Sequence, residues 1–215
     1  FLSACPSWAK LDVVASFSIL GDMVEQVAGD KATVTTIVGP DADAHLYAPT
    51  TGDAVAVSEA DLVIVNGLGF ETWSAKLIDA SGTDAAIAVA TTGITPLLVE
   101  GEIDPHAWNA LSNAIIYVDN IEAALSAASP EDAAIFKQNA DAYRAQLDRL
   151  HRRALADIAS LPADSRIVVT AHDAFGYLAD AYGLTFLAPQ GIDTEAEPSA
   201  KELAKLIGFL NETGA

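Results

Sequence analysis

The sequence predicts an α/β fold with two lobes, each built on a parallel sheet, joined by one long and rigid helix. Short apolar runs alternate with helical patterns in the first part of the chain, and the alternation resumes after Pro162. Repeated strand and helix units of this size are typical of parallel sheets with crossover helices. An unbroken helical stripe lies between the two regions and predicts the connecting helix.

The first lobe is predicted to span residues 10–128. Its strands are predicted from apolar or β-branched runs at residues 11–15, 32–38, 62–65 and 86–90. Its clearest helical patterns lie at residues 19–27, before Gly29, and from about Thr51 onward. Strands separated by helices in this way are expected to pair in parallel.

Residues 129–161 are predicted to form the connecting helix. Ser129 suits the N-cap and Pro130 the first helical position, and two acidic residues follow. Apolar or small residues then recur every three or four positions from Phe136 onward. About 30 residues would make roughly 45 Å of helix, more than one small lobe needs. We interpret the segment as a strut between the lobes, with a coiled-coil segment as the alternative.

The second lobe is predicted to occupy residues 162–215. Its strands are expected at residues 167–170 and 184–187, and its helices at residues 174–181 and 199–210. This region is much shorter than the first lobe. We therefore expect it to be the start of a lobe that is incomplete in this chain.

The first nine residues differ in character from the rest. They begin with apolar residues, and Ser7 and Ala9 supply the small side chains that precede a signal-peptide cleavage site. Residues 1–9 are therefore interpreted as a signal-peptide remnant. In a second interpretation Cys5 ends a lipoprotein box and carries a lipid anchor, and in a third the segment is an ordinary N-terminus. The first two both predict export to the periplasm.

The charge of the chain excludes some partners. Lys and Arg number 11 against 30 Asp and Glu, so the formal charge is −19. Such a surface repels nucleic acid and anionic lipid, and we expect neither as a partner. Cys5 is the single cysteine, so an intrachain disulfide cannot form.

Three of the four histidines are candidate metal ligands: His45, His106 and His172. Each lies in a loop after a predicted strand or before a predicted helix. Ligands of parallel α/β sheets bind beyond the carboxyl ends of the strands, where three imidazoles could converge. Imidazole nitrogen suits Zn²⁺, whereas carboxylate oxygen suits Mn²⁺. Their spacing forms no local motif, so capping or surface roles are the alternative for each.

Two further residues test this interpretation. His151 lies on the long helix beside two arginines and is predicted to sit on a solvated face. Asp104 is predicted either to orient the His106 ring as a hydrogen-bond acceptor or to cap the helix that follows. The sequence contains no nucleophile elbow, phosphate-binding loop or complete dinucleotide-binding motif, so we do not expect an enzyme.

From Val13 to Leu210 the chain resembles the metal-binding solute-binding proteins of ABC importers, cluster A-I, specific for zinc or manganese. Separately the matching motifs are modest, but in this order they are highly specific. They are ASFSILGDMVEQVAGD, DADAHLYAPT, ADLVIVNGLGFETW, DPHAWNALSNA, VVTAHDAFGYLADAYGL and EAEPSAKELAKLI.

The resemblance implies two lobes joined by a long helix, with the metal site in the cleft between the lobes. It places ligands at His45, His106 and His172 and, because manganese-type members often carry Glu at the third position, it favours zinc over manganese. The implied function is high-affinity capture of zinc in the periplasm and its delivery to a cognate ABC permease. The protein is expected to be a monomer, and a periplasmic metallochaperone is a further candidate partner.

The sequence departs from the family pattern in two ways. The fourth ligand, usually an acidic residue, would lie beyond Ala215, and Asp193, Glu195 and Glu197 match no ligand position. The His-rich loop that often precedes the second ligand is reduced to LLVEGEIDPH. The same three histidines are compatible with two alternative functions. One is a zinc-dependent hydrolase that uses a metal-bound water, and the other is a metal-stabilised adhesin.

Overall fold

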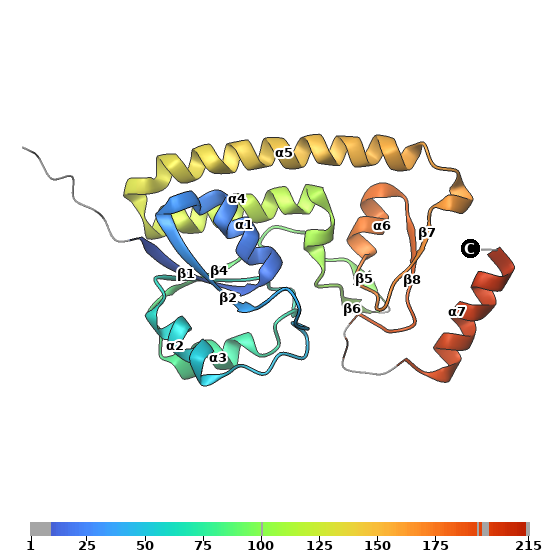
Figure 1. Ribbon diagram of the computed structural model, residues 1–215, viewed down its shortest axis with the longest axis horizontal. Coiled ribbons are helices and arrows are strands. Elements are labelled where there is room, and N and C mark those ends of the chain that lie inside the picture. The colour runs from blue at the N-terminus through green and yellow to red at the C-terminus, as the bar shows by residue number, and fades with distance from the viewer. Residues whose placement is uncertain (1–9, 100, 193, 195–197, 214–215) are drawn as a thin grey trace, which may run out of the picture.

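The computed structural model describes residues 10–99, 101–192, 194 and 198–213. Two α/β regions lie side by side, and one long helix runs along both of them (Figure 1). The predicted class, an α/β fold of two lobes with parallel sheets and a long connecting helix, is confirmed. The predictions for residues 1–9 lie outside the described residues.

The first lobe is built on a four-stranded parallel sheet with the order β2-β1-β3-β4. The central strands are fully buried where they pair, and Val13 of β1 lies between Val34 and Leu62. An apolar run without alternation is what a strand covered on both faces requires. The strands are β1 (Leu11–Phe17), β2 (Ala32–Val38), β3 (Leu62–Val65) and β4 (Ala86–Val89).

Helices cover both faces of this sheet, with α1 and α4 on one side and α2 and α3 on the other (Figure 1). Helix α2 begins with a capping box in which Thr50 and Asp53 satisfy each other's backbone amides. Helix α3 was not predicted; it is only eight residues long, and Leu77 is its one buried residue. The bounds are α1 (Ser18–Ala28), α2 (Thr51–Glu59), α3 (Ser74–Ser81) and α4 (Leu111–Ala128).

The long helix α5 (Ala133–Ala159) begins later than predicted. Pro130–Asp132 form a 3₁₀ turn that Ser129 precedes, so Ser129 starts the turn rather than the α-helix. The 27 residues of α5 make about 40 Å of helix. Phe136, Ala140 and Leu147 are buried, whereas Leu150 is 51% exposed. The apolar stripe is therefore packed along its first half.

The second lobe has a two-stranded parallel sheet, β7 (Ile167–Val169) with β8 (Thr185–Leu187). Helix α6 (Gly176–Tyr182) connects the strands and packs against α5, and α7 (Ala200–Thr213) follows. A short hairpin, β5 (Leu98–Val99) with β6 (Glu102–Ile103), was not predicted, because strands of two residues leave no periodic signal. Among the described residues, no helix is both long and apolar enough to cross a membrane.

Candidate metal centre

The three candidate histidines meet at one point, although they come from different loops. His45 lies in the loop between β2 and α2, His106 follows β6, and His172 follows β7. The Nε2 atoms of His45 and His106 are 3.0 Å apart. One ligand atom from each of the three lies within 4.8 Å of the others. Within the described residues, no other His, Cys, Asp or Glu side chains group in this way.

These distances suit one metal ion. Two nitrogens bound at about 2.0–2.1 Å in a tetrahedron lie about 3.4 Å apart. The observed separations, from 3.0 Å up to 4.8 Å, bracket that value. Shifts of the order of 1 Å in the side chains would therefore complete the coordination geometry.

Asp104 orients the second histidine. Its Oδ1 atom accepts hydrogen bonds from His106 Nδ1 at 2.8 Å and from the His106 backbone amide at 2.9 Å. Because an ionised carboxylate only accepts, the proton of the neutral ring resides on Nδ1, and the Nε2 lone pair faces His45 and His172. Of the two predicted roles for Asp104, the structure shows the ring-orienting one.

The surroundings of Asp104 leave little freedom for movement. Asp104 and His106 are 0% and 2% exposed. Tyr177 of α6 donates to the Asp104 carbonyl at 3.0 Å, and a Cβ atom on Gly176 would lie 2.6 Å from Asp104 Oδ2. The second-lobe helix α6 therefore approaches the carboxylate closely because position 176 has no side chain.

His172 is positioned by the backbone beyond β8. It forms an isolated parallel bridge with Gln190, and the Asp173 amide donates to the Gln190 carbonyl at 3.1 Å. His172 Nε2 is buried and makes no hydrogen bond to any described residue. Burial lowers the pKa of His172, and the neighbouring His106 ring lowers it further. The ring is therefore held neutral, with a nitrogen lone pair available.

His45 lies in the most exposed of the three ligand-carrying segments. It is half-buried, and its loop is mostly exposed. Asp43 Oδ1 accepts from the His45 backbone amide at 2.9 Å, and Trp73 Nε1 donates to the Ala44 carbonyl at 2.9 Å. A cleft of about 150 Å³ opens beside the ring, lined in part by Phe70 and Ile192.

A buried polar network beneath the cluster was missed by the sequence analysis. Glu71 accepts hydrogen bonds from Ser16 and from the Asn66 amide, and burial raises the pKa of its carboxyl. Asn66 Nδ2 donates to the Pro105 carbonyl at 3.0 Å, and Tyr117 donates to the Asn66 side chain. The end of β3 thus supports the segment that carries His106. The residue types alone carried no signal of this role.

The prediction for His151 was wrong. The structure shows it half-buried, with Nδ1 2.9 Å from the Tyr182 hydroxyl. Tyr182 ends α6, and the packing of α6 against α5 covers this face of the long helix. His151 lies outside the histidine cluster.

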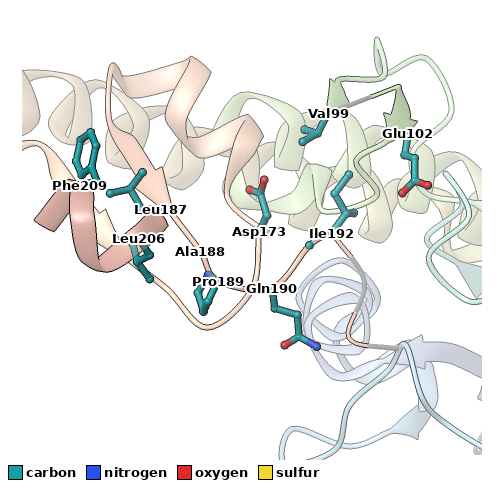
Figure 2. Close-up of a pocket in the computed structure, with 11 residues that line it drawn as sticks. Val99, Glu102, Asp173, Leu187, Ala188, Pro189, Gln190, Ile192, Leu206 and Phe209 are labelled. Atoms are coloured by element: carbon teal, nitrogen blue, oxygen red, sulfur yellow. The ribbon is translucent and has the colours of Figure 1, made fainter. Parts of the chain in front are cut away.

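A second cavity of about 420 Å³ is lined by Asp173, the neighbour of His172, and by residues of the second lobe and the β5–β6 hairpin (Figure 2). Val99 belongs to the β5–β6 hairpin, Leu206 to α7, and Gln190 and Ile192 to the segment after β8. None of the three histidines lines this cavity. Glu102 and Ile192 line both this cavity and the cleft beside His45. Asp193, Glu195 and Glu197 lie outside the described residues.

Fold and site together define a class of protein: a two-lobed α/β binding protein with a cluster of three imidazoles at the junction of its halves. Sequence comparison identifies the family. Residues 13–215 match the family ZnuA, described as "Zinc-uptake complex component A periplasmic", and the chain belongs to this family.

Curated relatives agree on the class and differ in the metal. The chain is 36% identical to the iron-binding protein YfeA of Yersinia pestis over 94% of its own length and 67% of that protein. It is 34% identical to the manganese-binding lipoprotein MntA of Bacillus subtilis over 94% of its length and 68% of that protein.

Solved structures agree on the fold. The periplasmic zinc-binding protein TroA of Treponema pallidum superposes with a TM-score of 0.91 at 32% identity, covering 95% of this chain and 76% of that one. A manganese-bound periplasmic metal-binding protein of Candidatus Liberibacter asiaticus gives a TM-score of 0.85 at 32% identity, covering 96% and 77%. The chain is therefore a metal-binding substrate-binding protein of the ABC-importer class and not an enzyme.

Proposed function

We propose that the protein captures Zn²⁺ in the periplasm through His45, His106 and His172 and delivers it to a cognate ABC permease. The observation that carries the proposal is the buried Nε2 atom of His172, which makes no hydrogen bond to any described residue. A buried polar atom without a partner is costly, and a bound metal ion would supply one. The Nε2 atoms of the other two histidines are 3.0 Å apart, and one ligand atom of each of the three lies within 4.8 Å of the others.

The donor set supports zinc. Three neutral imidazoles leave one position of a tetrahedron for a carboxylate or water, which is a common zinc arrangement. Manganese prefers oxygen donors, and the described part of the cluster contains none. Because relatives are named for iron, manganese and zinc, membership of the family alone does not select the ion.

Competition titration tests the choice of metal. Zn²⁺ is expected to displace Mn²⁺ from the parent protein at neutral pH. His172→Glu is expected to lower the ratio of Zn²⁺ affinity to Mn²⁺ affinity, because it replaces a nitrogen donor with an oxygen donor. The change in the variant is decisive, since zinc outranks manganese at most sites. An unchanged ratio in His172→Glu would contradict the zinc assignment.

A further inference from the structure

The loop that carries His45 is bonded to the other half of the molecule. Thr194 Oγ1 donates to Asp43 Oδ2 at 2.6 Å, although the two residues are 151 positions apart. The other oxygen of the same carboxylate accepts from the His45 amide. Asp43 therefore connects the backbone of the first ligand directly to the second lobe.

The same part of the second lobe also holds the third ligand. Gln190 forms the backbone bridge with His172, and Ile192 lines the cleft beside His45. Figure 2 shows Gln190 and Ile192 on one continuous segment beyond β8. Gln190 and Thr194 thus contact the site at two places, Gln190 on the His172 side and Thr194 on the His45 side.

The three ligands differ in how they are supported. The buried His106 ring is hydrogen-bonded to the buried Asp104 carboxylate, and the backbone of His172 forms a bridge with the backbone of Gln190. His45 is half-buried in a mostly exposed loop, and hydrogen bonds to Asp43 and from Trp73 hold the backbone of that loop at residues 44 and 45. Of the hydrogen bonds described for the loop, the one from Thr194 comes from the second lobe.

We propose that Asp43 is a positioning residue, and that its hydrogen bond with Thr194 keeps the His45 loop closed over bound metal and slows metal release. The proposal rests on the function proposed above. Loss of this bond removes the described hydrogen bond between the His45 loop and the second lobe, while His106 and His172 keep their own supports. His45 is therefore the ligand that leaves first when the metal dissociates.

The test measures the dissociation rate of Zn²⁺ into excess chromogenic chelator by stopped flow. Thr194→Val removes the hydroxyl and keeps the shape, whereas Thr194→Ser keeps the hydroxyl. We expect Thr194→Val to release zinc about threefold to tenfold faster, since a hydrogen bond at a partly exposed site contributes modestly. Thr194→Ser should release zinc at the parent rate.

Asp43→Ala should accelerate release at least as much, because it also removes the bond to the His45 amide. Adding Thr194→Val to Asp43→Ala should have no further effect, since the two groups form one interaction. Asp41→Ala is the matched control, because Asp41 is an exposed acid in the same loop and its loss changes the charge equally.

Two outcomes would overturn the inference: a parent-like rate in Thr194→Val, or additive effects of the two substitutions. His45→Ala in the same assay separates the two proposals. If His45→Ala binds zinc as tightly as the parent, the proposed function fails. If His45→Ala binds weakly while Thr194→Val releases zinc at the parent rate, only the role of the Asp43–Thr194 bond fails.

Discussion

Asp104 influences the chemistry of the site although it does not face the metal position. Its carboxylate selects the His106 tautomer and holds the ring, and both residues are buried. Asp104→Asn is expected to weaken zinc binding about 10-fold to 100-fold, because an amide cannot accept equally well from the ring and the backbone. Isothermal titration with zinc would measure this, and Asp119→Asn, an exposed carboxylate on α4, is the control. Equal affinities in the two variants would contradict the orienting role.

The residues of the site were predictable from the sequence to different degrees. His45, His106 and His172 were identified from their loops and from a family resemblance, and the structure brings them together. The Asp43–Thr194 bond and the support of Asn66 for Pro105 join residues far apart in the chain, so no local pattern marks them. His151 was misread for the same reason, because its partner Tyr182 lies on another helix.

At the scale of the element, α5 fixes the geometry of the first lobe by burying its apolar stripe against α1 and α4. Phe136 is 0% exposed, whereas Leu150 on the same helix is 51% exposed. Phe136→Ala is expected to lower the free energy of unfolding by about 3–5 kcal/mol, because it leaves a cavity in the core. Leu150→Ala is expected to change it by less than about 0.5 kcal/mol. Urea denaturation of both variants measures the difference, and similar losses would contradict this account of packing.

Elements were predicted well where burial or β-branched residues produce a strong pattern. The run at β3 is apolar and buried, the run at β2 on the sheet edge is rich in β-branched residues, and the bounds of both match the structure. The start of α6 was placed too early, because the chain after His172 turns back on itself before Gly176. The α3 helix and the β5–β6 hairpin are short, and elements of this length depend on contacts with the rest of the fold for their stability.

At the scale of the whole molecule, metal occupancy depends on pH through the three imidazoles. A protonated ring cannot bind metal, and an unperturbed histidine titrates near about pH 6.5. The pKa of His172 lies below its usual value because of burial and the neighbouring His106, so this ring stays neutral to lower pH. Occupancy should therefore persist at neutral pH and fall steeply below about pH 6 as protons replace the metal.

The lowered pKa of His172 also affects the stability of the metal-free protein. Because the unfolded chain binds a proton at His172 more readily than the folded chain, stability decreases as the pH falls through the unfolded pKa. The pKa of Asp43 is shifted in the same direction, but the cause is different. Partial burial opposes ionisation of its carboxyl, but hydrogen bonds from Thr194 and the His45 amide outweigh burial and hold the pKa below its usual range. The predicted pH dependence of zinc occupancy is tested by measuring zinc release with a chelator between about pH 7.5 and 4.5. Zinc occupancy that stays constant down to about pH 5 would argue against three imidazole ligands.

The central claim is that His45, His106 and His172 bind one zinc ion together. Anomalous diffraction at the zinc edge from zinc-loaded crystals tests it most directly. The account predicts one peak at about 2.0–2.1 Å from the Nε2 atom of each of the three histidines. A peak that lies beyond bonding distance of any of the three, or zinc found only at surface carboxylates, would contradict it.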